Sequence, residues 1–173
     1  WLPEEFKWCG SEYETRGARM DEEIQILQRI LGGGMVEFHG KHYDFAKLQM
    51  SPAPSKPVPL YLGGHELPGL KRAAKYGDGW SSAMLPSKKL LELVRKLNDL
   101  RKEYGRDHLP FEVQGVVTDV FNADGFKRLE AEGVTDVITM PWVLYGFGFG
   151  QAPIEKKIEG LRRFAEDVIA KMG

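Results

Sequence analysis

Cysteine is nearly absent from this sequence of 173 residues, in which Cys9 is the single one. One cysteine excludes a framework of intramolecular disulfides and is typical of a reducing compartment, so we expect a cytoplasmic protein. The first residue is Trp1 rather than Met, and we therefore expect a chain that was processed or cut at its start.

Long apolar runs and an excess of charge of one sign are missing as well. No apolar stretch approaches the roughly 20 residues of a membrane-spanning helix, and no signal-peptide pattern is present. The 24 basic and 25 acidic residues leave a net charge of −1, without a long basic run. We therefore expect no membrane or nucleic-acid partner. With 42% hydrophobic residues the chain can bury a real core, and we expect residues 1–173 to form a single domain.

The central stretch of the sequence, residues 57–80, has the order strand, glycine turn, helix, strand. Residues 60–62 are an apolar run typical of a buried strand, and Gly63 and Gly64 follow it directly. A helix with Leu70, Ala73 and Ala74 on one apolar face is then expected from Pro68, and Gly77 ends it. Paired glycines let the backbone approach a ligand closely, and the helix N-terminus offers N–H groups to an anion. The alternative is that the glycines make a tight turn and nothing more.

Apolar residues at helical spacing predict further helices, and runs of β-branched residues predict further strands. The expected helices are a first turn at 3–6, then 15–31, 87–104 with Ser87 as its cap, 124–132, and a last helix that begins at Pro153. A small β-hairpin is expected at 36–45, with Val36 and Phe38 in its first strand and Tyr43 and Phe45 in its second. Further strands are expected at 111–121 and 134–140, and a loop at 141–152.

Strands and helices alternate four times from Leu60 onward. This alternation predicts an α/β fold with a parallel sheet and helices packed outside it. No Rossmann fingerprint is present, since the glycines of 146–150 have the wrong spacing and no acidic residue follows at the ribose distance. Four βα units without that fingerprint suit half of a (β/α)8 TIM barrel.

His39 and His42 lie near the expected hairpin turn and could suggest a metal site. No cysteine or acidic cluster completes a ligand set, so we favour surface histidines and expect no bound metal.

Several short motifs follow one another in a fixed order along nearly the whole chain. They are residues 1–6, Arg16 with Asp21-Glu22, residues 39–43, the proline pairs Pro52/Pro54 and Pro57/Pro59, Gly63-Gly64, Arg72-Ala73-Ala74, and Gly77-Asp78-Gly79-Trp80. In this order and spacing they resemble the luciferase-like monooxygenase superfamily, most of all its oxidoreductases that depend on the deazaflavin coenzyme F420.

The resemblance implies a (β/α)8 barrel, of which this chain is similar to the C-terminal part, strands five to eight, plus a small β-hairpin insertion. It also implies a flavin or deazaflavin in the barrel mouth with its phosphate on the glycine turn. The residues that it assigns to the cofactor are Gly63, Gly64, His65, Trp80, Trp1 and Trp142. Core packing is the alternative for each tryptophan. The family's proton donors lie in the first half of the barrel, so no catalytic residue is assigned.

One position departs from the family pattern. Many members have serine two residues after the second glycine, where its hydroxyl can contact the phosphate, and this sequence has Glu66 there. A carboxylate would repel the phosphate unless it turns away or unless Lys71 or Arg72 compensates.

Three functions follow from these observations. The first is an F420-dependent oxidoreductase that transfers a hydride between the coenzyme and a small organic substrate. The second is an FMN-dependent monooxygenase of the same superfamily, which uses O2. The third is a non-catalytic half-barrel that self-associates. Half a barrel has open sheet edges and an uncovered inner face, so we expect a homo-oligomer or pairing with a missing N-terminal half.

Overall fold

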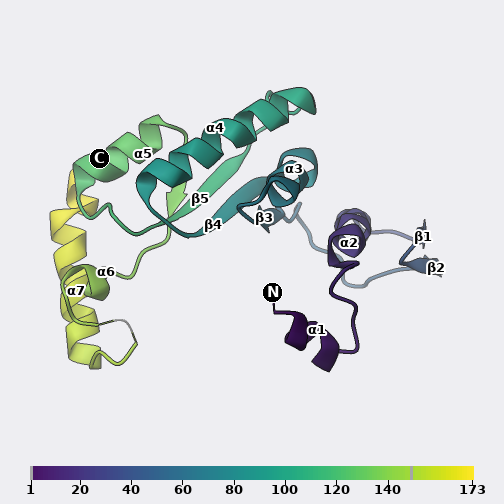
Figure 1. The fold of residues 1–173 in the computed structure, drawn as a ribbon, viewed down its shortest axis with the longest axis horizontal. Helices are drawn as coiled ribbons and strands as arrows, with labels where there is room; N and C mark the ends of the chain where they lie inside the picture. Colours follow the sequence, from purple (N-terminus) through teal and green to yellow (C-terminus); the bar gives the residue numbers. More distant parts are fainter. Residues whose placement is uncertain (1, 149) are drawn as a thin grey trace. The chain divides into compact units, whose positions relative to one another are not determined.

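The computed structural model describes residues 2–148 and 150–173, and Figure 1 shows their helices and strands. The chain divides into two compact units, Trp1–Pro59 and Leu60–Gly173, which we describe one at a time. Among the described residues, no helix combines the length and the apolar character needed to cross a membrane.

The first unit contains two helices and a hairpin, as expected from the sequence. Its elements are α1 (Pro3–Trp8), α2 (Arg16–Leu31), β1 (Val36–His39) and β2 (Asp44–Leu48). The two strands pair antiparallel, with Phe38 opposite Phe45. Tyr43, which we expected in the second strand, lies instead in the turn, because the chain between the strands bends around a side chain of α2.

That side chain is Glu22, whose carboxylate accepts the backbone N–H groups of Lys41, His42 and Tyr43 at 2.9, 2.9 and 3.0 Å. A side chain at Gly40 would put its Cβ 2.4 Å from a carboxylate oxygen of Glu22, so the close approach requires glycine there. Desolvation raises the pKa of Glu22, but the three N–H donors outweigh it and the net pKa is lowered. The carboxylate therefore ties the hairpin to α2 in its charged form.

The second unit is an α/β structure with one parallel sheet. Its elements are β3 (Tyr61–Gly63), α3 (Leu67–Tyr76), β4 (Gly79–Leu85), α4 (Ser87–Glu103), β5 (Glu112–Val117), α5 (Ala123–Ala131), β6 (Asp136–Val137), α6 (Pro141–Leu144), α7 (Ile154–Asp167) and the 3-10 turn η1 (Ile169–Lys171). The strands are parallel neighbours in the order β3-β4-β5-β6, which confirms the expected parallel sheet. The described strands leave this sheet open and do not close a barrel.

Helices α3, α4 and α5 lie along one face of the sheet (Figure 1) and form the core with it. Alternate residues of a strand point to opposite faces, and the side chains directed at the helices are apolar. The fully buried ones include Leu70, Ala73, Ala74, Trp80, Leu90 and Leu97. The expected apolar face of α3 is thus confirmed.

Three local predictions were wrong. Ser87 does not cap α4: Pro86 is the N-cap residue, and the Ser87 N–H and hydroxyl both donate to Asp119, at 2.7 and 3.0 Å. The expected loop at 141–152 contains α6, which Pro141 opens. The expected strands at 111–121 and 134–140 are shorter, because β5 ends before the loop that supplies Asp119 and β6 has a strand partner on one side only among the described strands.

Candidate functional site

The turn after β3 is the feature around which the candidate site is built. Gly64 has a φ of +113°, a conformation that side chains rarely adopt. A Cβ on Gly64 would lie 3.2 Å from the Cα of Gly69 in α3, and a Cβ on Gly69 would lie 3.0 Å from the Cα of Gly64. The exposed backbone at Gly63 and Gly64 therefore lies directly against the first turn of α3.

Gly69 was not recognised from the sequence, although it is as necessary to this contact as Gly64. The sequence did indicate it, because glycine lowers helix stability and Gly69 falls within the first turn of a helix with an apolar face. Its absent side chain lets the helix start approach the turn.

Trp80 holds the turn from the side of β4. Its side chain is fully buried, and its indole Nε1–H donates to the carbonyl oxygen of Gly64 at 2.9 Å. Full burial is what the core-packing alternative expects of this residue. The same tryptophan nevertheless contacts the turn through its one polar group.

His65 holds the turn to β4 at a second point. Its Nε2 accepts the backbone N–H of Ala83 at 3.0 Å. Its ring lies edge-on to that of Trp80, with 6.1 Å between the ring centroids. The structure thus brings four of the predicted site residues together: Gly63, Gly64, His65 and Trp80.

The helix that follows the turn supplies the polar groups. The first N–H groups of a helix have no intrahelical acceptor, and together with the helix dipole they favour an anion. Glu66 is the N-cap residue of α3, and its exposed side chain makes no capping hydrogen bond. Its carboxylate is the feature of this turn that opposes an anion.

Trp142 belongs to another part of the unit. It lies half-buried in α6, where a Cβ on Gly160 of α7 would be 2.5 Å from its Cα. Its indole nitrogen is buried without a hydrogen-bond partner in the structure as described, and Lys157 lies over its ring. Its contacts are those of α6 packing on α7. Trp1 lies outside the described residues.

The face of the sheet opposite α3 and α4 carries a row of polar side chains. Ser81 donates to Gln114 at 3.0 Å, and the Gln114 amide donates to Asp136 at 2.9 Å, which joins three strands. Tyr61 donates to Glu112, and this bond raises the pKa of Tyr61. These residues face neither the helices nor the core.

An apolar pocket of about 290 Å³ lies where β4, β5 and β6 end. It has no ionisable side chain in its lining, and α6 borders it. In parallel α/β sheets ligands bind at the carboxyl ends of the strands, which is also where the glycine turn follows β3. The lining residues are Met84, Val116, Val117, Thr118, Phe121, Ile138, Thr139, Met140, Val143 and Leu144.

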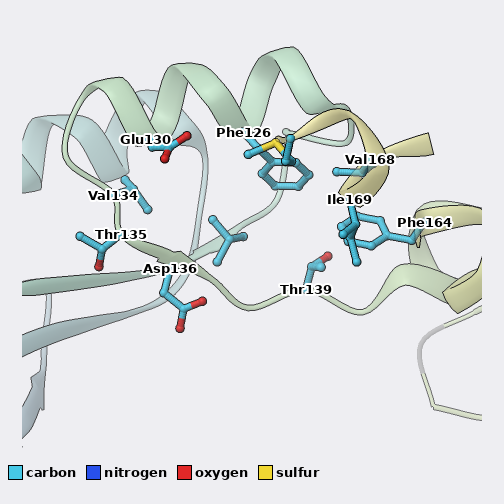
Figure 2. A pocket seen from close by; sticks show the side chains of 11 residues that line it. Phe126, Glu130, Val134, Thr135, Asp136, Thr139, Phe164, Val168 and Ile169 are labelled. Carbon is cyan, nitrogen blue, oxygen red and sulfur yellow. The ribbon is translucent and has the colours of Figure 1, made fainter. Parts of the chain in front are cut away.

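A second pocket, of about 260 Å³, lies between α5, β6 and the C-terminal segment (Figure 2). Glu130 and Asp136 lie at one end of it, and Phe126 and Phe164 meet edge-on at the other. The Asp136 carboxylate already accepts the Gln114 amide. Among the described residues, no group of three His, Cys, Asp or Glu side chains could hold a metal ion.

Comparison with known sequences gives a family match. The family model described as luciferase-like monooxygenase matches residues 1–118. An uncharacterized protein of Mycobacterium tuberculosis is 42% identical over 170 residues, which cover 98% of this chain and 58% of the relative. The chain thus spans somewhat more than half the length of that protein. Two weaker relatives have a named activity. The pyrimidine monooxygenase RutA of Allorhizobium ampelinum is 25% identical over 82% of this chain and 41% of its own length. The F420-dependent glucose-6-phosphate dehydrogenase of Amycolatopsis mediterranei is 24% identical over 77% of this chain and 49% of its own length.

Solved structures share the fold. The coenzyme F420-dependent tetrahydromethanopterin reductase from Methanopyrus kandleri matches with a TM-score of 0.69 and 14% identity, over 91% of this chain and 64% of the reductase. The monooxygenase RslO1 from Streptomyces bottropensis matches with a TM-score of 0.68 and 15% identity, over 100% of this chain and 67% of that protein. At these identities the likeness concerns the fold alone.

Proposed function

Because the chain belongs to the luciferase-like monooxygenase family, we propose that it holds the phosphate of a flavin or deazaflavin at the Gly63–Gly64 turn of an oxidoreductase. The observation that carries the proposal is the close approach of Gly64 to Gly69. It leaves a turn without side chains against the first turn of a helix, and this combination suits a phosphate.

The turn and the helix that follows it would have different roles in binding the phosphate. First-turn N–H groups of α3 would donate to the phosphate oxygens, while His65 and Trp80 hold the backbone in place. Glu66 opposes the phosphate, and Lys71 and Arg72 on the same helix would offset its charge. The bound cofactor would supply the redox chemistry, and the protein would orient it toward the substrate. Trp1 and Trp142 stay predicted pocket residues.

The first candidate function is hydride transfer between coenzyme F420 and a small organic substrate. It is supported by the sequence relative whose name includes F420, the glucose-6-phosphate dehydrogenase. The alternative is an FMN-dependent monooxygenase that uses O2. The likeness to the pyrimidine monooxygenase RutA supports the monooxygenase activity in this alternative. We assign no general acid or base in either case.

We further propose that the sheet supplies strands five to eight of a (β/α)8 barrel. Support comes from four parallel strands with helices along one face and from the polar row on the other face. The open face would be covered by an N-terminal half or by another copy of the chain, and a non-catalytic half-barrel that self-associates is the third candidate. A monomer by light scattering, with a cooperative thermal transition, would contradict the need for such a cover. A cytoplasmic location stays a prediction.

Fluorescence titration of the purified chain with F420 and, separately, with FMN tests the cofactor assignment. Tight binding of one cofactor alone would decide between the two enzymes. Gly64→Asp should then abolish binding, because it adds a side chain and a negative charge to the turn. Gly146→Asp is the matched control, since Gly146 also has a positive φ, of +80°, but has open space around it. Binding of neither cofactor would refute the enzyme proposals for this chain and favour the third candidate.

A further inference from the structure

Strand β4 contains an irregularity beside the turn. Its pairing with β5 shifts between Ser81 and Met84, so that two residues of β4 stand opposite one of β5. The Ser82 hydroxyl accepts the N–H of Val116 at 3.0 Å and so replaces a backbone acceptor at this point. The second of these two β4 residues is Ala83, and its N–H donates to Nε2 of His65.

The Ala83 N–H needs a side-chain acceptor because no backbone acceptor is available at its position in β4. Strand β3 ends at Gly63, which pairs with Ser81, so β3 offers no backbone partner to Ala83. Nε2 of His65 supplies the missing acceptor. Because a backbone N–H can only donate, this nitrogen accepts the hydrogen bond through its lone pair.

We propose that His65 is a positioning residue, which acts as a hydrogen-bond acceptor for β4 and thereby sets the affinity of the turn for the phosphate end of a ligand. This inference rests on the function proposed above. The sequence assigned His65 to the cofactor without a defined role, and the proposal gives it an indirect one, since its Nε2 is already bound to the Ala83 N–H.

The physical reason is the freedom of the two glycines. Gly63 and Gly64 have more backbone conformations to lose than other residues, and the cost of ordering them would reduce ligand affinity. The Trp80 indole holds the carbonyl of Gly64, and the hydrogen bond between His65 and Ala83 attaches the end of the turn to a second position of β4. With both bonds made, the turn is ordered before a ligand arrives.

Three variants separate positioning from direct contact. His65→Gln keeps an acceptor oxygen at similar reach, His65→Leu removes the acceptor, and His65→Lys offers donors and a positive charge. We expect His65→Leu and His65→Lys to weaken FMN or F420 binding about tenfold, the order of one lost hydrogen bond, and His65→Gln to restore most of it. Binding of riboflavin, which is FMN without its phosphate, should be the same in all four proteins.

A second readout needs no cofactor. Hydrogen exchange of the Ala83 amide should be about tenfold faster in His65→Leu than in the wild type and in His65→Gln. If no cofactor binds the wild-type protein while the Ala83 amide behaves as expected, the positioning of the turn stands and its role in phosphate affinity is refuted along with the proposed function. Unchanged Ala83 exchange in His65→Leu, or full phosphate-dependent affinity in His65→Lys, would overturn the role assigned to His65.

Discussion

The Tyr61 hydroxyl donates a hydrogen bond to Glu112 from β3 to β5, over the intervening strand β4. The ring can cross because residue 79 is glycine: a Cβ there would lie 2.6 Å from the Tyr61 ring. Together with the bonds from Ser81 to Gln114 and on to Asp136, this contact gives the open face of the sheet a polar, hydrogen-bonded surface.

Replacing Glu112 with glutamine should lower the pKa of Tyr61. The hydrogen bond to Glu112 comes first among the causes that raise this pKa, followed by desolvation and by the charges of Glu112, Asp136 and Asp78. Glutamine keeps an acceptor but removes one negative charge, so the phenol should ionise at lower pH than in the wild type. NMR titration of ¹³C-labelled tyrosines, with Tyr61→Phe for assignment, measures the change. Glu132→Gln, at the C-cap of α5, serves as the control, and an equal shift of the Tyr61 pKa in this variant would contradict the assignment.

Gly69→Ala should destabilise the protein, although alanine is the better helix former. Its Cβ would lie 3.0 Å from the Cα of Gly64 and 3.2 Å from the carbonyl oxygen of Gly63, so the turn must move. We expect a loss of about 1–3 kcal/mol in the free energy of unfolding, the usual cost of overpacking. Urea unfolding measures it against Gly150→Ala, a control with open space and, like Gly69, without a positive φ, which should cost less. A stabilised Gly69→Ala would disprove the close contact.

Glu66→Ser should raise the affinity for FMN or F420. The substitution removes a negative charge beside the phosphate and adds a hydroxyl that can cap α3. We expect a gain of about threefold to tenfold at low salt, smaller at high salt because the site is exposed. Titrations at two ionic strengths, with Glu103→Ser at the far end of α4 as the charge-matched control, measure it. Equal gains in both variants would mean that net charge, and not the turn, is responsible.

The hairpin of the first unit should loosen in acid. The pKa of Glu22 is lowered in the folded protein, so its contribution to stability is present above the ordinary glutamate pKa of about 4.3 and is lost as the pH falls through the folded value. Aromatic NMR signals of the stacked pair Phe38 and Phe45 report on the hairpin during acid titration. In Glu22→Gln the hairpin should be weaker at neutral pH and respond less to acid. A Glu22→Gln protein with the wild-type pH response would exclude the Glu22 contact as the cause.

The sequence predicted the parallel sheet, the apolar face of α3 and the glycine turn because these depend on local periodicity and on glycine itself. The Asp119 contact that replaces a Ser87 cap could not be predicted, since it joins residues 32 positions apart. The bulge in β4 and its His65 partner were missed for the same reason: pairing register depends on neighbouring strands. The role of Gly69 could have been predicted, because helix propensity disfavours glycine at a helical position.

Backbone amide NMR of the wild-type protein, titrated with FMN or F420 and in parallel with riboflavin, tests the central claim most directly. If the turn holds a phosphate, the amide signals of Gly63, Gly64 and Gly69 should shift with the phosphorylated cofactor that binds and stay in place with riboflavin. Signals that stay in place with both cofactors, or that shift equally with riboflavin, would contradict a phosphate site at Gly63–Gly64.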